Sequence, residues 1–145
     1  MTTSPAGSST LAAGRGGMRG RRLLALGLLA AVVVAGLVVH GALPDVAATD
    51  IAGDALYAVA AYLAIVVVAP RLGPLVVGVI AAAWCVGVEL FQLTGLPLAW
   101  GAVFTPAMLM FGTVFDPRDL AVYLVTVAIA AGVDASVRAV RRSRR

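Results

Sequence analysis

The residues best suited to chemistry are two polar side chains inside a long apolar stretch, Glu89 and Gln92. Three positions apart in a helix, they share one face and can direct hydrogen bonds the same way. A charged carboxylate in hydrocarbon is costly, so Glu89 should face other helices, pair with another group or stay protonated. Such a carboxyl group can bind a cation, accept hydrogen bonds from a ligand or exchange a proton.

Two other segments repeat this arrangement of an acid with a polar partner on the same helical face. Asp54 is followed by Tyr57, and Asp119 is followed by Tyr123. Both pairs fall at the expected outer start of an apolar stretch, at the depth of Glu89, which predicts an acidic cluster near one membrane surface. Two simpler roles stay open: the aspartates also suit helix N-termini, and the tyrosines also suit the interface. For Glu89, a binding site and a structural polar clamp are equal alternatives.

Known catalytic and cofactor motifs are missing. The one histidine, His40, could join the cluster, although an interfacial or capping role suits it better. The sequence has no metalloprotease, nucleophile-elbow, phosphate-loop or dinucleotide motif. Its one cysteine, Cys85, excludes an intrachain disulfide and suits a buried apolar site. We therefore expect no cofactor and no metal, and we favour a protein that is not an enzyme.

Four apolar stretches must position these residues. A helix of about 20 apolar residues crosses a bilayer core of about 30 Å. Three stretches meet that length, and the second does if its flanking residues snorkel; they are 23–43, 55–69, 75–93 and 120–137. Of the 145 residues, 61% are hydrophobic and 12% are charged, and the mean hydropathy is +1.01, which leaves no room for a water-soluble domain. We predict an all-α integral membrane protein with one four-helix domain, residues 21–138.

The net charge of +4 reflects arginines at the ends of the apolar stretches, so we expect no nucleic-acid partner. These arginines precede the first stretch or follow the last: Arg15, Arg19, Arg21, Arg22, Arg138, Arg141, Arg142, Arg144 and Arg145. Positively charged segments stay in the cytoplasm, and the acidic loop 44–54 falls on the other side. This pattern predicts a multi-pass protein of the plasma membrane with both termini cytoplasmic. Its arginine-rich termini should contact anionic lipid headgroups.

The chain ends are predicted to be tails. Residues 1–20, rich in Ser, Thr, Gly and Ala, suit a disordered cytoplasmic tail, and residues 139–145 suit a basic cytoplasmic tail. The first apolar stretch exceeds the roughly 7–15 residues of a signal-peptide core, which favours an uncleaved first helix.

Residues 96–115 carry no charge but are a poor helix. They are interrupted by Pro97, Gly101, Pro106 and Gly112. A fifth span would also place the C-terminal arginines outside. We therefore predict a re-entrant or interfacial segment between the third and fourth spans, with its irregular backbone covered by other helices or facing a wet cavity.

Small residues recur four positions apart, as at Gly78 and Ala82 or Ala131 and Ala135. In lipid, small residues allow helix backbones to approach closely. They predict a compact bundle, and they fit packing within the chain, a homodimer or a membrane protein partner.

The polar residues also lie in short motifs that resemble a known family. The motifs are Gly53-Asp54-Ala55-Leu56-Tyr57-Ala58 with Tyr62, Glu89-Leu90-Phe91-Gln92-Leu93, Gly112-Thr113-Val114-Phe115 and Asp119-Leu120-Ala121-Val122-Tyr123. Together they resemble the bacterial membrane family called domain of unknown function 2809, over about residues 23–137. That family is distantly similar to VanZ-like proteins, which also place Glu-x-x-Gln and a later Asp beside membrane helices. The resemblance implies four membrane helices and no assigned reaction.

The chain departs from this family in two places. Members tend to carry arginines between the Glu-x-x-Gln and Gly-x-x-Phe motifs, where this chain has uncharged residues, and a glycine where Thr126 stands here. Apart from Arg118, the acids therefore have no obvious counter-charge.

Three functions fit these features. The favoured one is a non-enzymatic envelope protein whose outward-facing acidic cluster binds a lipid headgroup, a cation or a partner protein. The second is a proton-coupled carrier or an oligomeric pore, which would need a dimer because four helices are few. The third is an intramembrane enzyme that acts on a lipid or cell-wall precursor, with Glu89 and Asp119 as acid and base.

Overall fold

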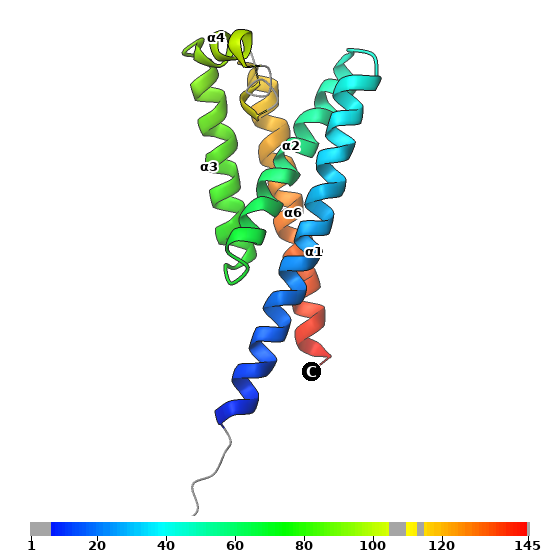
Figure 1. Cartoon of the computed structure of the whole chain (residues 1–145), viewed down its shortest axis with the longest axis vertical. Coiled ribbons are helices and arrows are strands. Elements are labelled where there is room, and N and C mark those ends of the chain that lie inside the picture. The colour runs from blue at the N-terminus through cyan, green and yellow to red at the C-terminus, as the bar shows by residue number, and fades with distance from the viewer. Residues whose placement is uncertain (1–6, 105–109, 113–114, 145) are drawn as a thin grey trace, which may run out of the picture.

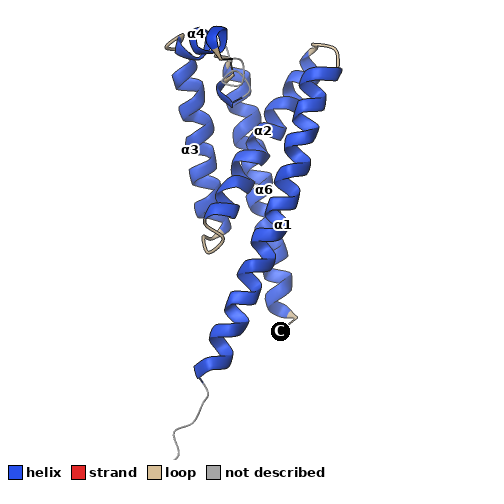
Figure 2. Ribbon diagram, in the orientation of Figure 1, coloured by secondary structure: helices blue, strands red, loops and turns tan. Residues whose placement is uncertain are grey.

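The computed structural model is helical and has no strand in the part of the chain that it describes (Figure 2). It describes residues 7–104, 110–112 and 115–144, with the side chains given from residue 18 onward. The helices are α1 (Gly7–Ala42), α2 (Ala47–Val68), α3 (Pro74–Gln92), α4 (Leu96–Val103) and α6 (Pro117–Ser143) (Figure 1).

Four helices are long and apolar enough to cross a membrane, which confirms the predicted all-α membrane fold with four spans. They cover Met18–Ala42, Ala47–Val68, Pro74–Gln92 and Pro117–Ser143. Proline opens α3 and α6, because the first helical position needs no backbone N–H. The second helix begins earlier than its apolar stretch, so that Asp54 lies within α2 and not at its start.

The core is a packing of α2, α3 and α6, and α1 lies along α2 (Figure 1). Its buried side chains are mostly small or β-branched: Ala58, Tyr62, Val66, Val77, Ala81, Cys85, Tyr123 and Val127. Cys85 is fully buried, as predicted. Helices α3 and α6 approach closely at Gly78, where an added Cβ would lie 3.3 Å from the Cβ of Ala131. Small residues therefore do allow close helix contact at this point.

The segment after α3 turns sharply and runs into α4. Gly95 has a φ of 70°, a left-handed conformation that glycine adopts without strain. With eight residues, α4 is too short to cross a membrane, and Figure 1 shows it at one end of the bundle. Its Trp100 ring packs 5.3 Å from that of Phe91. The predicted re-entrant course depends largely on residues 105–109 and 113–114, which lie outside the described residues.

Both terminal helices extend into segments expected to be tails. Helix α1 begins at Gly7, and α6 runs to Ser143. No proline interrupts either extension. The extension at the start of α1 contains five glycines, which are weak helix formers, so helix propensity does not account for it.

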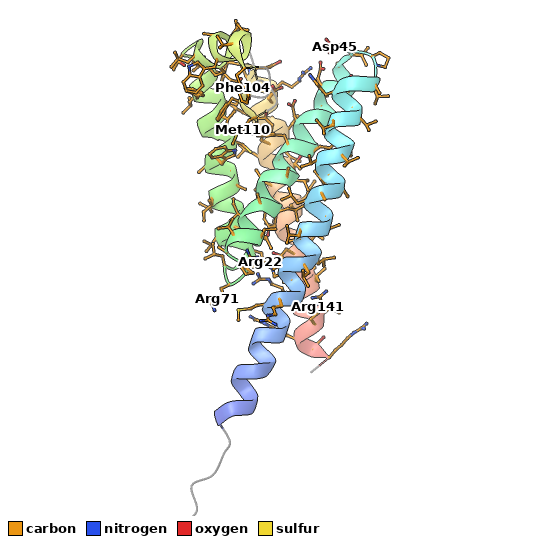
Figure 3. The ribbon with its side chains drawn as sticks, in the orientation of Figure 1. Arg22, Asp45, Arg71, Phe104, Met110 and Arg141 are labelled. Atoms are coloured by element: carbon orange, nitrogen blue, oxygen red, sulfur yellow. The ribbon has the colours of Figure 1, made fainter. Side chains whose placement is uncertain are left out.

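The two ends of the bundle have opposite charge. Figure 3 shows Arg22, Arg71 and Arg141 toward one end, here called the basic end, and Asp45 at the other, the acidic end. This separation matches the charge pattern of the sequence.

Candidate functional site

Helices α2 and α6 bring together the two predicted acid–tyrosine pairs. The Tyr123 hydroxyl donates a hydrogen bond to Asp54 Oδ1 at 3.4 Å. The rings of Tyr57 and Tyr123 lie 6.0 Å apart between centroids. The Asp119 carboxyl lies beside that of Asp54. These four residues therefore lie in one region at the acidic end.

Glu89 joins this region from α3. Its side chain is 0% exposed, and Oε2 accepts a hydrogen bond from the backbone N–H of Asp116 at 3.3 Å. The carboxyl also lies beside Tyr123 and Asp119. Within the described part of the chain, its Oε1 has no hydrogen-bond partner. A buried polar atom without a partner carries a desolvation penalty, which makes this oxygen the most unusual atom of the site.

Two further predicted residues hold the backbone that leads into α6. Gln92 donates a hydrogen bond from Nε2 to the carbonyl of Phe111 at 2.8 Å, and Tyr57 donates one to the carbonyl of Met110 at 2.8 Å. Gly112 makes this approach possible, because its φ is 64° and a Cβ there would lie 2.4 Å from Gln92 Nε2. The Glu-x-x-Gln motif thus has a structural task as well, because Gln92 binds the backbone of Phe111 and Glu89 binds that of Asp116.

The interpretation of the two aspartates as cap or dipole partner of a helix N-terminus fits Asp119 as a dipole partner and does not fit Asp54. Asp116 is the cap of α6, since its side chain accepts a hydrogen bond from the N–H of Arg118 at 2.8 Å. Asp119 lies in the first turn of α6, where its charge still favours the helix dipole. Asp54 lies beyond the first turn of α2, whose first-turn acid is Asp50. Neither Asp54 nor Asp119 is needed as a cap.

Arg118 is the counter-charge that the sequence indicated. Its guanidinium nitrogens lie 3.8 Å from Asp50, 3.8 Å from Asp116 and 3.7 Å from Asp119. These separations exceed hydrogen-bond length, and the Arg118 side chain is 42% exposed. The positive charge of the arginine therefore offsets the charge of these acids without hydrogen bonds, from the edge of the site.

We call Asp54, Glu89, Asp119 and Tyr123 the acidic cluster. Three buried carboxylate oxygens in it lack a hydrogen-bond partner among the described residues: Asp54 Oδ2, Glu89 Oε1 and Asp119 Oδ1. Over the same residues, no group of three or more His, Cys, Asp or Glu side chains is placed to hold a metal ion. Chemically, three such oxygens attract positive charge and hydrogen-bond donors.

His40 is not part of this arrangement. It is exposed on α1, and no hydrogen bond or ion pair from it occurs among the described residues.

A second polar network, at the basic end, was underestimated from the sequence. Asp134 and Arg138 stand four positions apart, a spacing that predicts an ion pair within one helix, and that contact exists at 3.3 Å. In addition, Asp134 Oδ2 lies 2.6 Å from an Arg21 nitrogen and accepts a hydrogen bond from the Tyr62 hydroxyl at 2.9 Å. Asp134 therefore joins α1, α2 and α6.

The same two arginines also fix the turn between α2 and α3. Arg21 donates a hydrogen bond to the carbonyl of Pro70 at 2.6 Å, and Arg138 donates one to that of Leu72 at 2.7 Å. The signals for this network were Tyr62, which lies close to the first motif, and Arg21, which lies at the start of the first span. Neither signal reveals its partner without knowledge of which helices are neighbours.

Comparison with known proteins adds one finding. The family model described as "Protein of unknown function (DUF2809)" matches residues 43–127. This region includes the whole acidic cluster with Tyr57 and Gln92, but neither α1 nor Asp134. No curated protein and no solved structure matches the chain. The similarity to VanZ-like proteins stays a prediction.

Proposed function

Since the chain belongs to the family described as "Protein of unknown function (DUF2809)", a description that assigns no activity, we propose its function from the site itself. The protein is a small multi-pass membrane protein that binds rather than catalyses. Its acidic cluster receives a positively charged group at one membrane surface. That group belongs to an envelope lipid headgroup, a cation or a partner protein.

The observation that carries this proposal is that Glu89 is buried with one carboxyl oxygen lacking a hydrogen-bond partner among the described residues. Its side chain is fully buried, and Oε1 has no hydrogen-bond partner among the described residues. Structural carboxylates in apolar surroundings normally have all their oxygens satisfied. Unsatisfied oxygens on Asp54 and Asp119 lie in the same cluster. A bound cationic donor would satisfy the oxygen of Glu89, and this supports a ligand site over a purely structural clamp.

The middle of the bundle favours binding over conduction. Between the acidic cluster and Asp134, the buried side chains are apolar, namely those of Ala58, Val77, Ala81, Cys85 and Val127. A proton or ion needs polar groups along its path. Within the described residues, the two polar networks are thus separated by an apolar layer.

Replacing Glu89 by glutamine should weaken binding of a cationic ligand. The probe is a fluorescent dansyl-labelled alkylammonium, titrated into detergent-solubilised protein and followed by fluorescence anisotropy. Because a hydrogen bond to a charged group contributes more than a neutral one, we expect about a tenfold loss of affinity.

Asp45→Asn is the matched control, since Asp45 is an exposed acid at the same end. It should bind the probe like the parent protein. Equal affinity of Glu89→Gln and the parent, with unchanged thermal unfolding, would show that the cluster is not a cation site.

We also propose that the basic end lies in the cytoplasm, which places both termini there and Asp45 outside the plasma membrane. The arginines at this end would then contact anionic headgroups. In a Cys85→Ala background, a membrane-impermeant maleimide added to intact cells should label Asp45→Cys. It should label Arg144→Cys only after permeabilisation. The reverse pattern would invert the topology.

A further inference from the structure

Beside the acidic cluster lies a positive group, and together they form a site with two opposite charges. We propose that the ligand is a phosphoethanolamine group, with its ammonium in the acidic cluster and its phosphate on Arg118. This inference rests on the proposed function and names the ligand class of the same site.

The geometry of Arg118 suits a phosphate. Its contacts to Asp50, Asp116 and Asp119 are all 3.7–3.8 Å, longer than hydrogen bonds, so they do not fix the direction of its N–H groups. The side chain is 42% exposed at the acidic end. Guanidinium groups donate to phosphate through two parallel N–H bonds.

The chemistry of the acidic cluster suits a primary ammonium. Such a group donates N–H bonds, and buried oxygens of the cluster lack partners among the described residues, namely Asp54 Oδ2, Glu89 Oε1 and Asp119 Oδ1. The fully buried Glu89 is the strongest of these signals. A quaternary ammonium such as choline has no N–H donor and would leave all three oxygens unsatisfied.

Asp119 connects the two halves of the site. Its Oδ1 lies 3.7 Å from Arg118 Nε and belongs to the acidic cluster at the same time. The positive and negative positions are therefore adjacent, which fits a ligand whose phosphate and ammonium are joined by two carbon atoms. A diffusible metal ion, or an amine that carries no phosphate, would contact only the acidic cluster and not Arg118.

A different role for Arg118, as a cation that fills the acidic cluster itself, predicts the opposite effect of its removal, and this makes the proposal testable. If the guanidinium acted as a tethered cation that occupies the cluster, its removal would strengthen the binding of every amine. If it binds phosphate, its removal weakens binding only of ligands that carry one.

The experiment is isothermal titration of the detergent-solubilised full chain with short-chain phosphatidylethanolamine, the corresponding phosphatidylcholine, O-phosphoethanolamine and ethylammonium. We expect phosphatidylethanolamine to bind at least about tenfold more tightly than phosphatidylcholine. Arg118→Gln should weaken phosphatidylethanolamine about tenfold and leave ethylammonium unchanged, whereas Arg118→Lys, which keeps the charge but loses the planar fork, should fall between. Glu89→Gln should weaken both.

Arg71→Gln, which removes an exposed arginine near the basic end, is the control and should bind like the parent. Comparison of the lipid with O-phosphoethanolamine separates a membrane lipid from a soluble source of the same headgroup. Unchanged or tighter phosphatidylethanolamine binding by Arg118→Gln would overturn this inference and leave the proposed function standing. Unchanged binding of both amines by Glu89→Gln would overturn the proposed function itself.

Discussion

Replacing Asp134 by alanine is expected to destabilise the protein by about 3 kcal/mol, because it leaves buried positive charge without its partner. The carboxyl pairs with Arg21 at 2.6 Å and with Arg138 at 3.3 Å. The side chains of Arg21 and Asp134 are only 14% and 19% exposed, so water cannot replace the lost contacts fully. The free energy of unfolding, measured by SDS titration in mixed micelles, reports the change.

Two variants show whether this effect comes from the network. Asp45→Ala removes an exposed acid and should leave the free energy of unfolding unchanged. Combining Arg21→Met with Asp134→Leu replaces one ion pair by apolar groups and should restore part of the lost stability, since only Arg138 then lacks its acidic partner. If Asp134→Ala were as stable as Asp45→Ala, the network would have no structural importance.

Replacing Gly112 by alanine is expected to destabilise the connection between α4 and α6 by about 2–3 kcal/mol, from left-handed strain and a lost buried hydrogen bond. The φ of 64° is unfavourable for any residue with a side chain. The new Cβ would also lie 2.4 Å from Gln92 Nε2, which must then leave the carbonyl of Phe111. Unfolding free energy, measured as above, should fall accordingly.

Gly87→Ala is the matched control, because nothing lies within 4 Å of a Cβ at that helical position. It should be neutral or slightly stabilising, since alanine is a better helix former. In a Gln92→Ala background, Gly112→Ala should cost less than in the parent, because the clash and the hydrogen bond are already gone. Full additivity of the two substitutions would contradict the contact described here.

The membrane spans were predictable because lipid imposes a length and a composition that a single sequence displays. Their exact ends were not. Helix α2 begins at Ala47 and carries Asp50 and Asp54 within it, whereas an apolar window stops at such charges. At the membrane surface, caps and helix propensity decide where a helix ends, and both act independently of hydropathy.

The candidate site was predictable to the level of depth and helical face. The spacing predicts that Asp54, Glu89 and Asp119 lie near the same surface, each with a polar residue about one turn away. The partners of Gln92 and Asp134 were not predictable, since they depend on which helices are neighbours. The residue types also do not reveal which backbone carbonyl a side chain binds, as Gln92 binds that of Phe111.

The contact between Arg21 and Asp134 also has a consequence for biosynthesis. It joins two residues 113 positions apart, on the first and last of the four candidate membrane helices among the described residues. Because a polypeptide emerges from its N-terminus, α1 enters the membrane long before its acidic partner has been translated. The pair forms only when α6 arrives, so it marks completion of the bundle. A nascent chain stopped before Asp134 therefore leaves Arg21 without its acidic partner.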